Sequence, residues 1–310
     1  MLTRIAVIAF NTYRESVRAR ILHGLFGVAL AAAAYSLVVG AYALNARLRV
    51  VSDLGAASTS LFAVVVAIVI GATSLYRELE LKTIFPILAR PIGRGEYLVG
   101  KTLGTVLTLA VFVAANSGLL LLALSAMAGR SPSLIVLLLA LALVAIVLVA
   151  WRVPRARIWL PLVFAMLTLG AGVVFSAVAP DERRVIVGSA ALVLCEVAIV
   201  TSIATLFSAF SSPFLTAIFT LGLFIVGRSA DTLAALPPRV FGEVIHGTGS
   251  FLSKIVPNLM LYQPPRALLT GEAAGVELGS YLLSALLHAV AWSVLLLGAA
   301  TLIFRRRDFL

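Results

Sequence analysis

Long uncharged runs dominate this chain and alternate with short segments that hold most of its charge. A helix needs about 20 mostly apolar residues to cross a bilayer, and lipid offers no partner for unpaired backbone groups. Proline interrupts one long run at Ser211-Ser212-Pro213, because it ends a helix. The pattern predicts an all-α polytopic membrane protein with about eight transmembrane helices, near residues 21–46, 54–76, 102–129, 131–151, 158–180, 185–209, 214–229 and 278–304.

Composition narrows the class of protein further. The 310 residues are 62% hydrophobic and 12% charged, whereas soluble domains are about 45–50% apolar and about 25% charged. The single cysteine, Cys195, excludes a disulfide framework and a cysteine zinc site. Three histidines on separate elements give no metal-ligand cluster. We therefore expect no metal site, no cofactor bound by this chain and no catalytic residue.

The net charge of +11 is explained by membrane orientation. Membrane proteins keep Lys and Arg on the cytoplasmic side of their spans. With the N-terminus in the cytoplasm, 15 of the 24 basic residues fall on inner segments. Eight spans then return the C-terminus to the cytoplasm, and no nucleic-acid partner is needed to account for the charge.

Residues 1–20 are expected to form an amphipathic helix at the membrane interface, and not a cleaved signal peptide. At helical spacing, one arc carries the polar side chains and the opposite face carries apolar ones. The polar residues are Arg4, Asn11, Arg14, Glu15 and Arg18. A simple anchor and a mechanical role are both open for this helix.

Residues 95–102, GEYLVGKT, match the phosphate-binding pattern G-x-x-x-x-G-K-[ST] letter for letter. That loop requires a buried strand before it and a helix after it. The preceding ILARPIGR contains two arginines and a proline, which is not a buried strand. We expect Gly95 and Lys101 not to bind nucleotide. The non-membrane segments are also too small for a nucleotide-binding domain, which needs a sheet with flanking helices.

Residues 77–104, RELELKTIFPILARPIGRGEYLVGKTLG, resemble the first cytoplasmic loop of ABC-2 type transporter permeases. The likeness is strongest to the branch that includes nitrous-oxide-reductase maturation and gliding-motility permeases. An acidic pair precedes a threonine, a short apolar helix, an Arg-Pro and a further arginine, and then Gly100-Lys101. The amphipathic N-terminus, the terminal FRRRDFL and the segment PNLMLYQPPRALLTGE also fit. The family usually has six spans, so residues 131–180 are interpreted as an inserted helix pair.

The resemblance implies a permease in the bacterial cytoplasmic (inner) membrane. It would form a homodimer and bind separate ATPase subunits that hold ATP and Mg²⁺. The loop at 77–95 would carry a coupling helix that seats on the ATPase, as amphipathic helices do in grooves. A helix that contacts only lipid is the alternative. The coupling residues would be Glu78, Glu80, Thr83, Ile84, Phe85, Ile87, Leu88, Arg90 and Arg94.

Three polar residues lie inside predicted spans, namely Glu196, Asn116 and His288. A charge at such depth is costly and normally faces protein or a water-filled path. Glu196 would bind a cationic group, take up a proton or bond to another helix, while Asn116 and His288 are interpreted as helix–helix contacts. Residues 228–280 are expected to form an outer re-entrant segment, with an apolar helical face over 239–256 that Gly247 and Gly249 interrupt.

Two functions stay open at this point. One is ATP-driven export through a permease that uses a separate ATPase subunit. The other is a permease that moves no substrate and instead transmits force to a periplasmic partner protein. A membrane-embedded enzyme is not supported, because no paired carboxylates or histidine–acid cluster share a face.

Overall fold

The computed structural model describes residues 2–43, 45–80, 93–273 and 275–306. Every regular element among these residues is helical and none is a strand, which confirms the all-α class. In chain order they are α1 (Leu2–Arg18), α2 (Arg20–Tyr42), α3 (Arg47–Glu80), α5 (Arg94–Met127), α6 (Pro132–Arg152), η1 (Pro154–Ile158), α7 (Leu160–Phe175), η2 (Ser176–Val178), α8 (Pro180–Ser208), α9 (Pro213–Arg228), α10 (Ala230–Ala234), α11 (Pro238–Phe241), α12 (Glu243–Ile255), η3 (Met260–Tyr262), α13 (Arg266–Thr270) and α14 (Leu278–Arg306).

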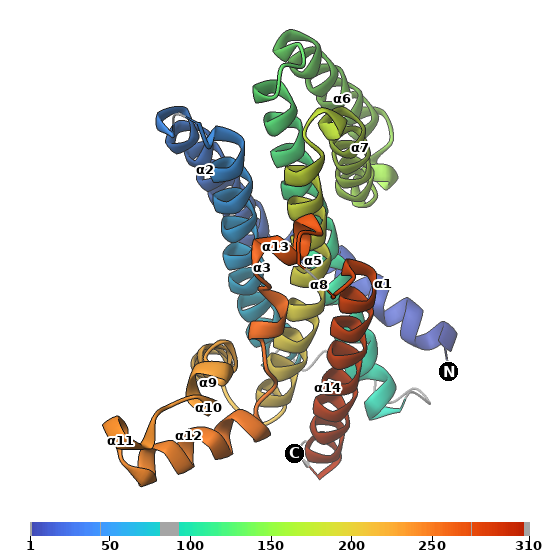
Figure 1. The fold of residues 1–310 in the computed structure, drawn as a ribbon. Helices are drawn as coiled ribbons and strands as arrows, with labels where there is room; N and C mark the ends of the chain where they lie inside the picture. The colour runs from blue at the N-terminus through green and yellow to red at the C-terminus, as the bar shows by residue number, and fades with distance from the viewer. Residues whose placement is uncertain (1, 44, 81–92, 274, 307–310) are drawn as a thin grey trace.

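Helices α3, α5 and α8 form the centre of the bundle (Figure 1). Apolar side chains that these helices bury completely, such as Val66, Val113 and Val197, belong to one large core cluster. Tyr97 and Phe304 pack together at one end of the bundle, which we call the proximal end. Val51 on α3, Leu124 on α5 and Ile186 on α8 pack together at the other end, the distal end.

Seven helices among the described residues are long and apolar enough to cross a membrane. The predicted break at Ser211-Ser212-Pro213 is confirmed, because α8 ends at Ser208 and α9 begins at Pro213. The eighth expected run, α9, is apolar but has only 16 residues. At 1.5 Å per residue it is about 24 Å long, less than the roughly 30 Å of a hydrocarbon core.

The chain passes from the proximal end of α8 to the start of α14 in two pieces, residues 213–228 and 257–270, which we call the two-part return. The first piece ends at Arg228, which contacts Glu196 in the second half of α8. After α10 to α12, the Leu259 N–H donates to the Gly227 carbonyl oxygen at 3.0 Å, so the second piece resumes where the first stopped. It continues to Arg266 at the distal end. The eighth pass along the bundle is therefore discontinuous.

Both ends of the described chain meet at the proximal end. Arg4 on α1 lies 4.0 Å from the Glu96 carboxylate near the start of α5. The Arg94 guanidinium donates to the carbonyl oxygens of Phe304 and Arg305 at 2.9 and 3.0 Å. An even number of passes explains this arrangement, and the assignment of the shared end to the cytoplasm stays a prediction.

The run at 95–102 lies inside α5, so the turn that a phosphate loop needs is not formed. Gly100 in this run and Gly104 just after it instead let α1 pack closely against α5. A Cβ at Gly104 would lie 2.3 Å from the Ala9 carbonyl oxygen, and one at Gly100 would lie 2.8 Å from the Ile8 Cβ. Two small residues four apart allow such backbone approach between helices. Gly100 and Gly104 therefore form the seat of α1.

Helix α1 is attached at its other end as well. The buried Tyr13 hydroxyl donates to the Ile158 carbonyl oxygen at 3.2 Å, and burial raises the pKa of Tyr13, so the phenol keeps its proton. Phe10 stacks on Trp159 with ring centroids 4.9 Å apart. The polar arc that the sequence predicts is exposed, which confirms the amphipathic helix. Contact with α5 and η1 means that α1 is part of the bundle.

Helices α6 and α7, which the sequence analysis interprets as an inserted pair, differ in their packing. Helix α7 approaches α5 closely, since a Cβ at Gly172 would lie 2.8 Å from the Gly118 carbonyl oxygen. Helix α6 buries only Ile135 among its 21 residues. One member of the pair is therefore fixed to the bundle, and the other presents most of its surface to lipid or to a partner.

The expected break within 239–256 is in a different place. Helix α12 continues through Gly247 and Gly249, and the chain turns instead at Gly242, whose φ of +81° suits glycine. A Cβ at Gly249 would lie 2.8 Å from the Leu233 carbonyl oxygen. The predicted break at Gly247 and Gly249 is wrong. Gly249 instead serves close packing of α12 on α10. The placement of 228–280 on the outer side stays a prediction.

We predict that Gly104→Ala lowers thermal stability, because the new Cβ forces α1 away from α5. Overpacking of this kind costs about 1–3 kcal/mol, which corresponds to a melting temperature lower by roughly 2–4 °C per kcal/mol in a chain of this size class. The measurement is thermal unfolding of the purified protein in detergent. Gly27→Ala in α2 is the control, since nothing lies within 4 Å of its Cβ. Equal melting temperatures for the two variants would contradict the seat.

Candidate functional site: a buried ion pair and a distal ion cluster

Glu196 makes a two-pronged ion pair with Arg228 in the middle of the bundle. The Arg228 Nε donates to Glu196 Oε1 at 2.8 Å and an Nη donates to Oε2 at 2.9 Å. The same Nη donates to the Ser60 Oγ at 2.9 Å, and Ser60 itself donates to Oε2 at 3.4 Å. Three elements, α3, α8 and the end of α9, are therefore held at one point, which we call the buried pair.

Burial makes this contact costly to break. The Glu196 side chain has no exposed surface and that of Arg228 is 22% exposed. An arginine fork matches a carboxylate with two parallel hydrogen bonds, which is the strongest geometry for such a pair. The guanidinium also lies 5.0 Å from the Phe224 ring centroid, where a cation is attracted to the ring face. Removing one partner would leave a buried charge unpaired.

The sequence identified one member of this site and missed two. It gave Glu196 as an intramembrane polar residue with a bond to another helix among its roles, and an interhelical ion pair is what the structure contains. Arg228 was assigned to the outer segment, and Ser60 was not singled out. The length of α9 could have identified Arg228. An apolar run that is too short to cross the membrane and ends in arginine suggests that the arginine pairs with an acidic residue inside the membrane.

Asn116 and His288 do not join this site. The Asn116 Nδ2 donates to the Phe112 carbonyl oxygen of its own helix at 3.1 Å. The His288 Nδ1 lies 2.9 Å from the Tyr262 hydroxyl, which in turn donates to the Ala285 carbonyl oxygen. His288 thus connects α14 to the two-part return, as a helix contact. The three polar residues have separate partners, and no common binding site is formed by them.

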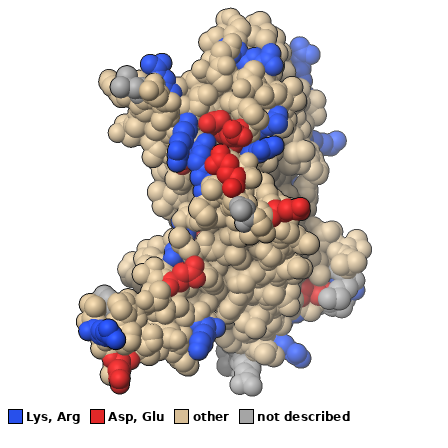
Figure 2. All heavy atoms as spheres, in the orientation of Figure 1, with Lys and Arg blue, Asp and Glu red and all other residues tan. Residues whose placement is uncertain are grey.

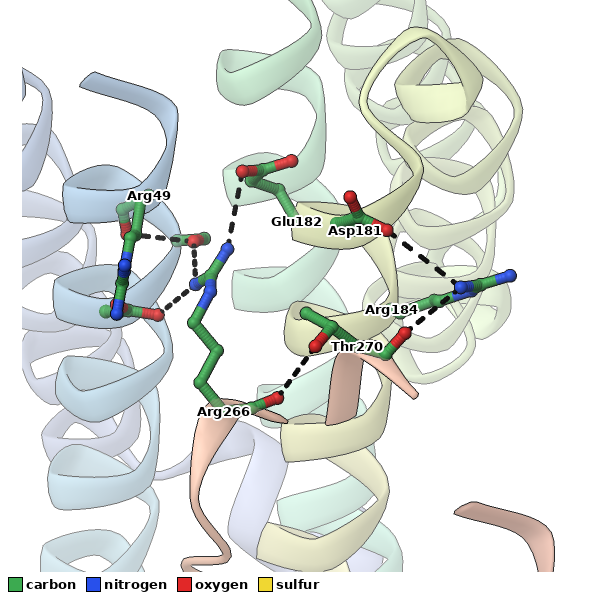
Figure 3. Close-up of polar contacts among 8 residues, drawn as sticks. Arg49, Asp181, Glu182, Arg184, Arg266 and Thr270 are labelled. Carbon is green, nitrogen blue, oxygen red and sulfur yellow. Dashed lines mark hydrogen bonds and ion pairs between the residues drawn. The ribbon is translucent and has the colours of Figure 1, made fainter. Parts of the chain in front are cut away.

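A second polar site lies at the distal end, where the starts of α3 and α8 meet α13 (Figure 3). The Arg266 guanidinium binds the Asp53 carboxylate, the Ser52 Oγ at 3.1 Å and Glu182 Oε1 at 3.3 Å. Arg49 lies 3.8 Å from Asp53 on the same helix. We call these residues the distal ion cluster. Figure 2 shows acidic and basic side chains gathered on this face of the molecule.

A neighbouring arginine adds a further tie. The Arg184 guanidinium donates to the Thr270 carbonyl oxygen at 3.1 Å and lies 3.9 Å from Asp181 (Figure 3). Thr270 is the last residue of α13, so its carbonyl is one that a helix leaves unpaired. The Arg184 guanidinium supplies a hydrogen-bond donor to that carbonyl oxygen and so caps the C-terminus of α13. Two arginines therefore fix α13 against α8.

One face of α3 connects the two polar sites. Asp53, Ala56, Ala57 and Ser60 follow the i, i+3, i+4, i+7 spacing of a single helix face. They line a cavity of about 250 Å³ that is closed on the other side by α8 and by residues 262–269. Motion of α3 along its axis would therefore change the buried pair and the distal ion cluster together.

A family model described as ABC-2 family transporter protein matches residues 5–309. The chain belongs to the ABC-2 transporter family. Comparison with curated proteins finds no match for this ABC-2 chain. Members of the family are membrane components of ABC transporters, which work with an ABC ATPase. The matched range spans residues 131–180, and their interpretation as an inserted pair stays a prediction.

Most of the coupling residues expected in this ABC-2 chain lie outside the described residues. Glu78 and Glu80 lie in the last turn of α3, and their side chains are outside the described part of the structure. Arg94 is described, and it binds the carbonyl oxygens at the end of α14. The remaining residues lie outside the described residues and comprise Thr83, Ile84, Phe85, Ile87, Leu88 and Arg90.

The ABC-2 bundle also carries a wide apolar groove. Its volume is about 850 Å³, and it is lined by α5, α8 and α14. Cys195, the residue before Glu196, is on its wall. Such a surface suits acyl chains or another apolar helix and offers little to a polar solute.

We predict non-additive stability changes at the buried pair. Glu196→Gln and Arg228→Met should each destabilise the protein by about 3–5 kcal/mol, because each leaves the other partner buried without its charge. The double variant should be more stable than either single variant, since no unpaired charge is left. Thermal unfolding of all four proteins in the same detergent measures this.

Ser52→Ala is a matched polar deletion at the distal end, where Arg266 keeps two carboxylate partners. It should cost less than about 1.5 kcal/mol, as for one ordinary hydrogen bond. Additive losses in the Glu196→Gln and Arg228→Met double variant would refute the pairing.

Proposed function

We propose that this ABC-2 chain is the membrane-spanning permease subunit of an ATP-driven exporter in the bacterial cytoplasmic membrane. A homodimer of it would bind two separate ATPase subunits through residues 77–95. The observation that carries the proposal is that the two helices flanking this segment, the end of α3 and the start of α5, lie at the end of the bundle where the N- and C-terminal helices also meet. The family match supports the pairing with an ABC ATPase.

Polar contacts at the proximal end support transmission of force from this segment into the bundle. Beyond the Arg94 bonds to α14, the Lys101 Nζ on α5 donates to the Ser74 carbonyl oxygen on α3 at 2.5 Å. A displacement of either flanking helix near the loop would therefore move its neighbours, and α14 would move with α5.

Helix α3 is the proposed transmission element. It runs without interruption over 34 residues, which is about 51 Å of helix. One of its ends borders the proposed ATPase-binding loop, and the other carries Asp53 in the distal ion cluster. In this account a stroke of the ATPase shifts α3 and loosens the Asp53–Arg266 contact, which opens the distal end. The coupling requires these contacts to have two arrangements, which both ends of the helix can bias.

Force transmission without export is the alternative function. In that case the distal end would act on a periplasmic protein, and α3 would work in the same manner. Comparison of ATPase stimulation by candidate amphiphiles and by candidate partner proteins, with the complex in nanodiscs, separates the two functions. Stimulation by amphiphiles alone supports export.

We predict that Phe85→Ala weakens ATPase binding by about thirtyfold. An apolar patch on a short charged loop is normally covered by a partner, and truncation of a buried aromatic anchor typically costs about 2 kcal/mol. Co-purification at graded ATPase concentrations measures the affinity. Glu80→Gln at the polar rim should have a milder effect that depends on salt.

Phe251→Ala is the control for that experiment, because Phe251 is an exposed aromatic on α12. It should leave the ATPase affinity unchanged. Wild-type affinity and function in Phe85→Ala would show that residues 77–95 contact only lipid, and the docking assignment would fail.

We also predict that the proximal end faces the cytoplasm. Single cysteines at positions 153 and 181, in a Cys195→Ser background, occupy exposed sites after α6 and at the start of α8. A membrane-impermeant maleimide should label position 181 in intact cells and position 153 only after permeabilisation. The reverse result would invert the topology and place the loop at 77–95 outside.

A further inference from the structure

The inserted helix pair encloses a second cavity that is separate from the buried pair and from the apolar groove. It has a volume of about 560 Å³ and lies between α1, α2, α5, α6 and η1–α7. Volumes of about 300–1,000 Å³ are typical of small-molecule sites. Along α5 its lining runs from Thr108 to Leu119, which is about 16 Å of helix and roughly half the thickness of a hydrocarbon core.

Charge is confined to one end of this cavity. Its lining near Thr108 includes Arg157 and His23, while its opposite end is formed by Leu30, Leu119 and Leu139. The Arg157 Nε donates to the Ala150 carbonyl oxygen at 2.9 Å, which holds the guanidinium between α6 and α7. No carboxylate is among the described residues that line the cavity.

More basic residues surround the same end. Arg152 ends α6 shortly before Arg157, and Arg14 and Arg18 lie on α1 beside the lining residue Val17. Glu15 is the acidic residue of α1, and it is exposed. A positive mouth on an apolar slot of this length has the chemistry of an anionic headgroup with one acyl chain.

We propose that this cavity binds an anionic phospholipid, with its phosphate at Arg157 and one acyl chain along α5 between α2 and α6. The lipid would fill the space that α6 leaves open, since that helix buries only Ile135 against protein. The inserted pair then works as a lipid-binding module, and it fixes α1 and η1 through the same headgroup. The site does not depend on which function the permease performs.

Photolabelling of the full-length chain in nanodiscs tests the site. The probe is phosphatidylglycerol with a diazirine in its acyl chain, and phosphatidylcholine with the same chain is the comparison. The phosphatidylglycerol probe should label peptides that contain residues 108–119 and 139–146, several times more strongly than the phosphatidylcholine probe. Equal labelling by the two probes would overturn the proposed headgroup selectivity.

Two pairs of variants localise the binding. Arg157→Gln should reduce labelling about tenfold, the expected effect of losing one charge-assisted hydrogen bond. Arg155→Gln removes the same charge two residues away and should leave labelling unchanged, because Arg155 does not line the cavity. Leu143→Trp should fill the slot and block labelling, whereas Leu141→Trp on another face of α6 should not. Only variants that have the same melting temperature as the wild type are compared.

Competition identifies the source of the phosphate. Excess dioctanoyl phosphatidylglycerol should suppress labelling, and excess inorganic phosphate should not. Suppression by inorganic phosphate to the same extent would mean that the mouth binds free anions and that the acyl slot contributes nothing. Equal losses in Arg155→Gln and Arg157→Gln would reduce the effect to general surface charge and overturn the site.

Discussion

The arrangement of this ABC-2 chain depends on one buried charge. Glu196 has no exposed surface, so its carboxylate requires a partner within the protein. Arg228 supplies that partner from the end of α9, and Ser60 supplies a hydroxyl from α3. The demand for pairing at this depth explains why α9 stops inside the bundle, and why the chain resumes beside it at Leu259. Discontinuous segments of this kind occur in membrane proteins where the irregular backbone is covered by protein.

The same contact gives α3 a defined position relative to α8 and α9. Asp53, seven residues earlier on the same face of α3, forms an ion pair with Arg266. This pair fixes α3 to α13 at the distal end. Packed helices change position in discrete steps, because interdigitated side chains resist gradual sliding. An uninterrupted α3 with polar contacts at two heights is therefore suited to move as a unit between two arrangements.

Much of the architecture was predictable from hydrophobic patterning alone. The uncharged runs identified the membrane helices, Ser211-Ser212-Pro213 identified a true helix break, and the spacing of Arg4, Arg14 and Arg18 gave the exposed face of α1. These are local signals, which a helix expresses regardless of its neighbours. The family resemblance read from residues 77–104 agrees with the family match over residues 5–309, while the branch within the family stays a prediction.

The tertiary contacts were not predictable in the same way. Gly100 matches a phosphate-loop motif and Gly249 resembles a helix breaker in the sequence, but both serve close packing against another helix, which only the fold can reveal. Arg228 and Arg266 lie in a segment that the sequence interpreted as outside the bundle, and their partners are about 30 to 210 positions away along the chain. Polar residues that pair over such separations along the chain produce no periodic pattern in the sequence.

We propose above all that α3 carries movement from residues 77–95 to the distal ion cluster. The most direct measurement is the distance between spin labels at Leu54 on α3 and Ala267 on α13, in the permease–ATPase complex diluted with unlabelled permease. The account predicts that this distance increases when the complex is trapped with ATP, and returns on hydrolysis. An unchanged distance in the trapped complex, with ATP bound and the ATPases closed, would contradict it.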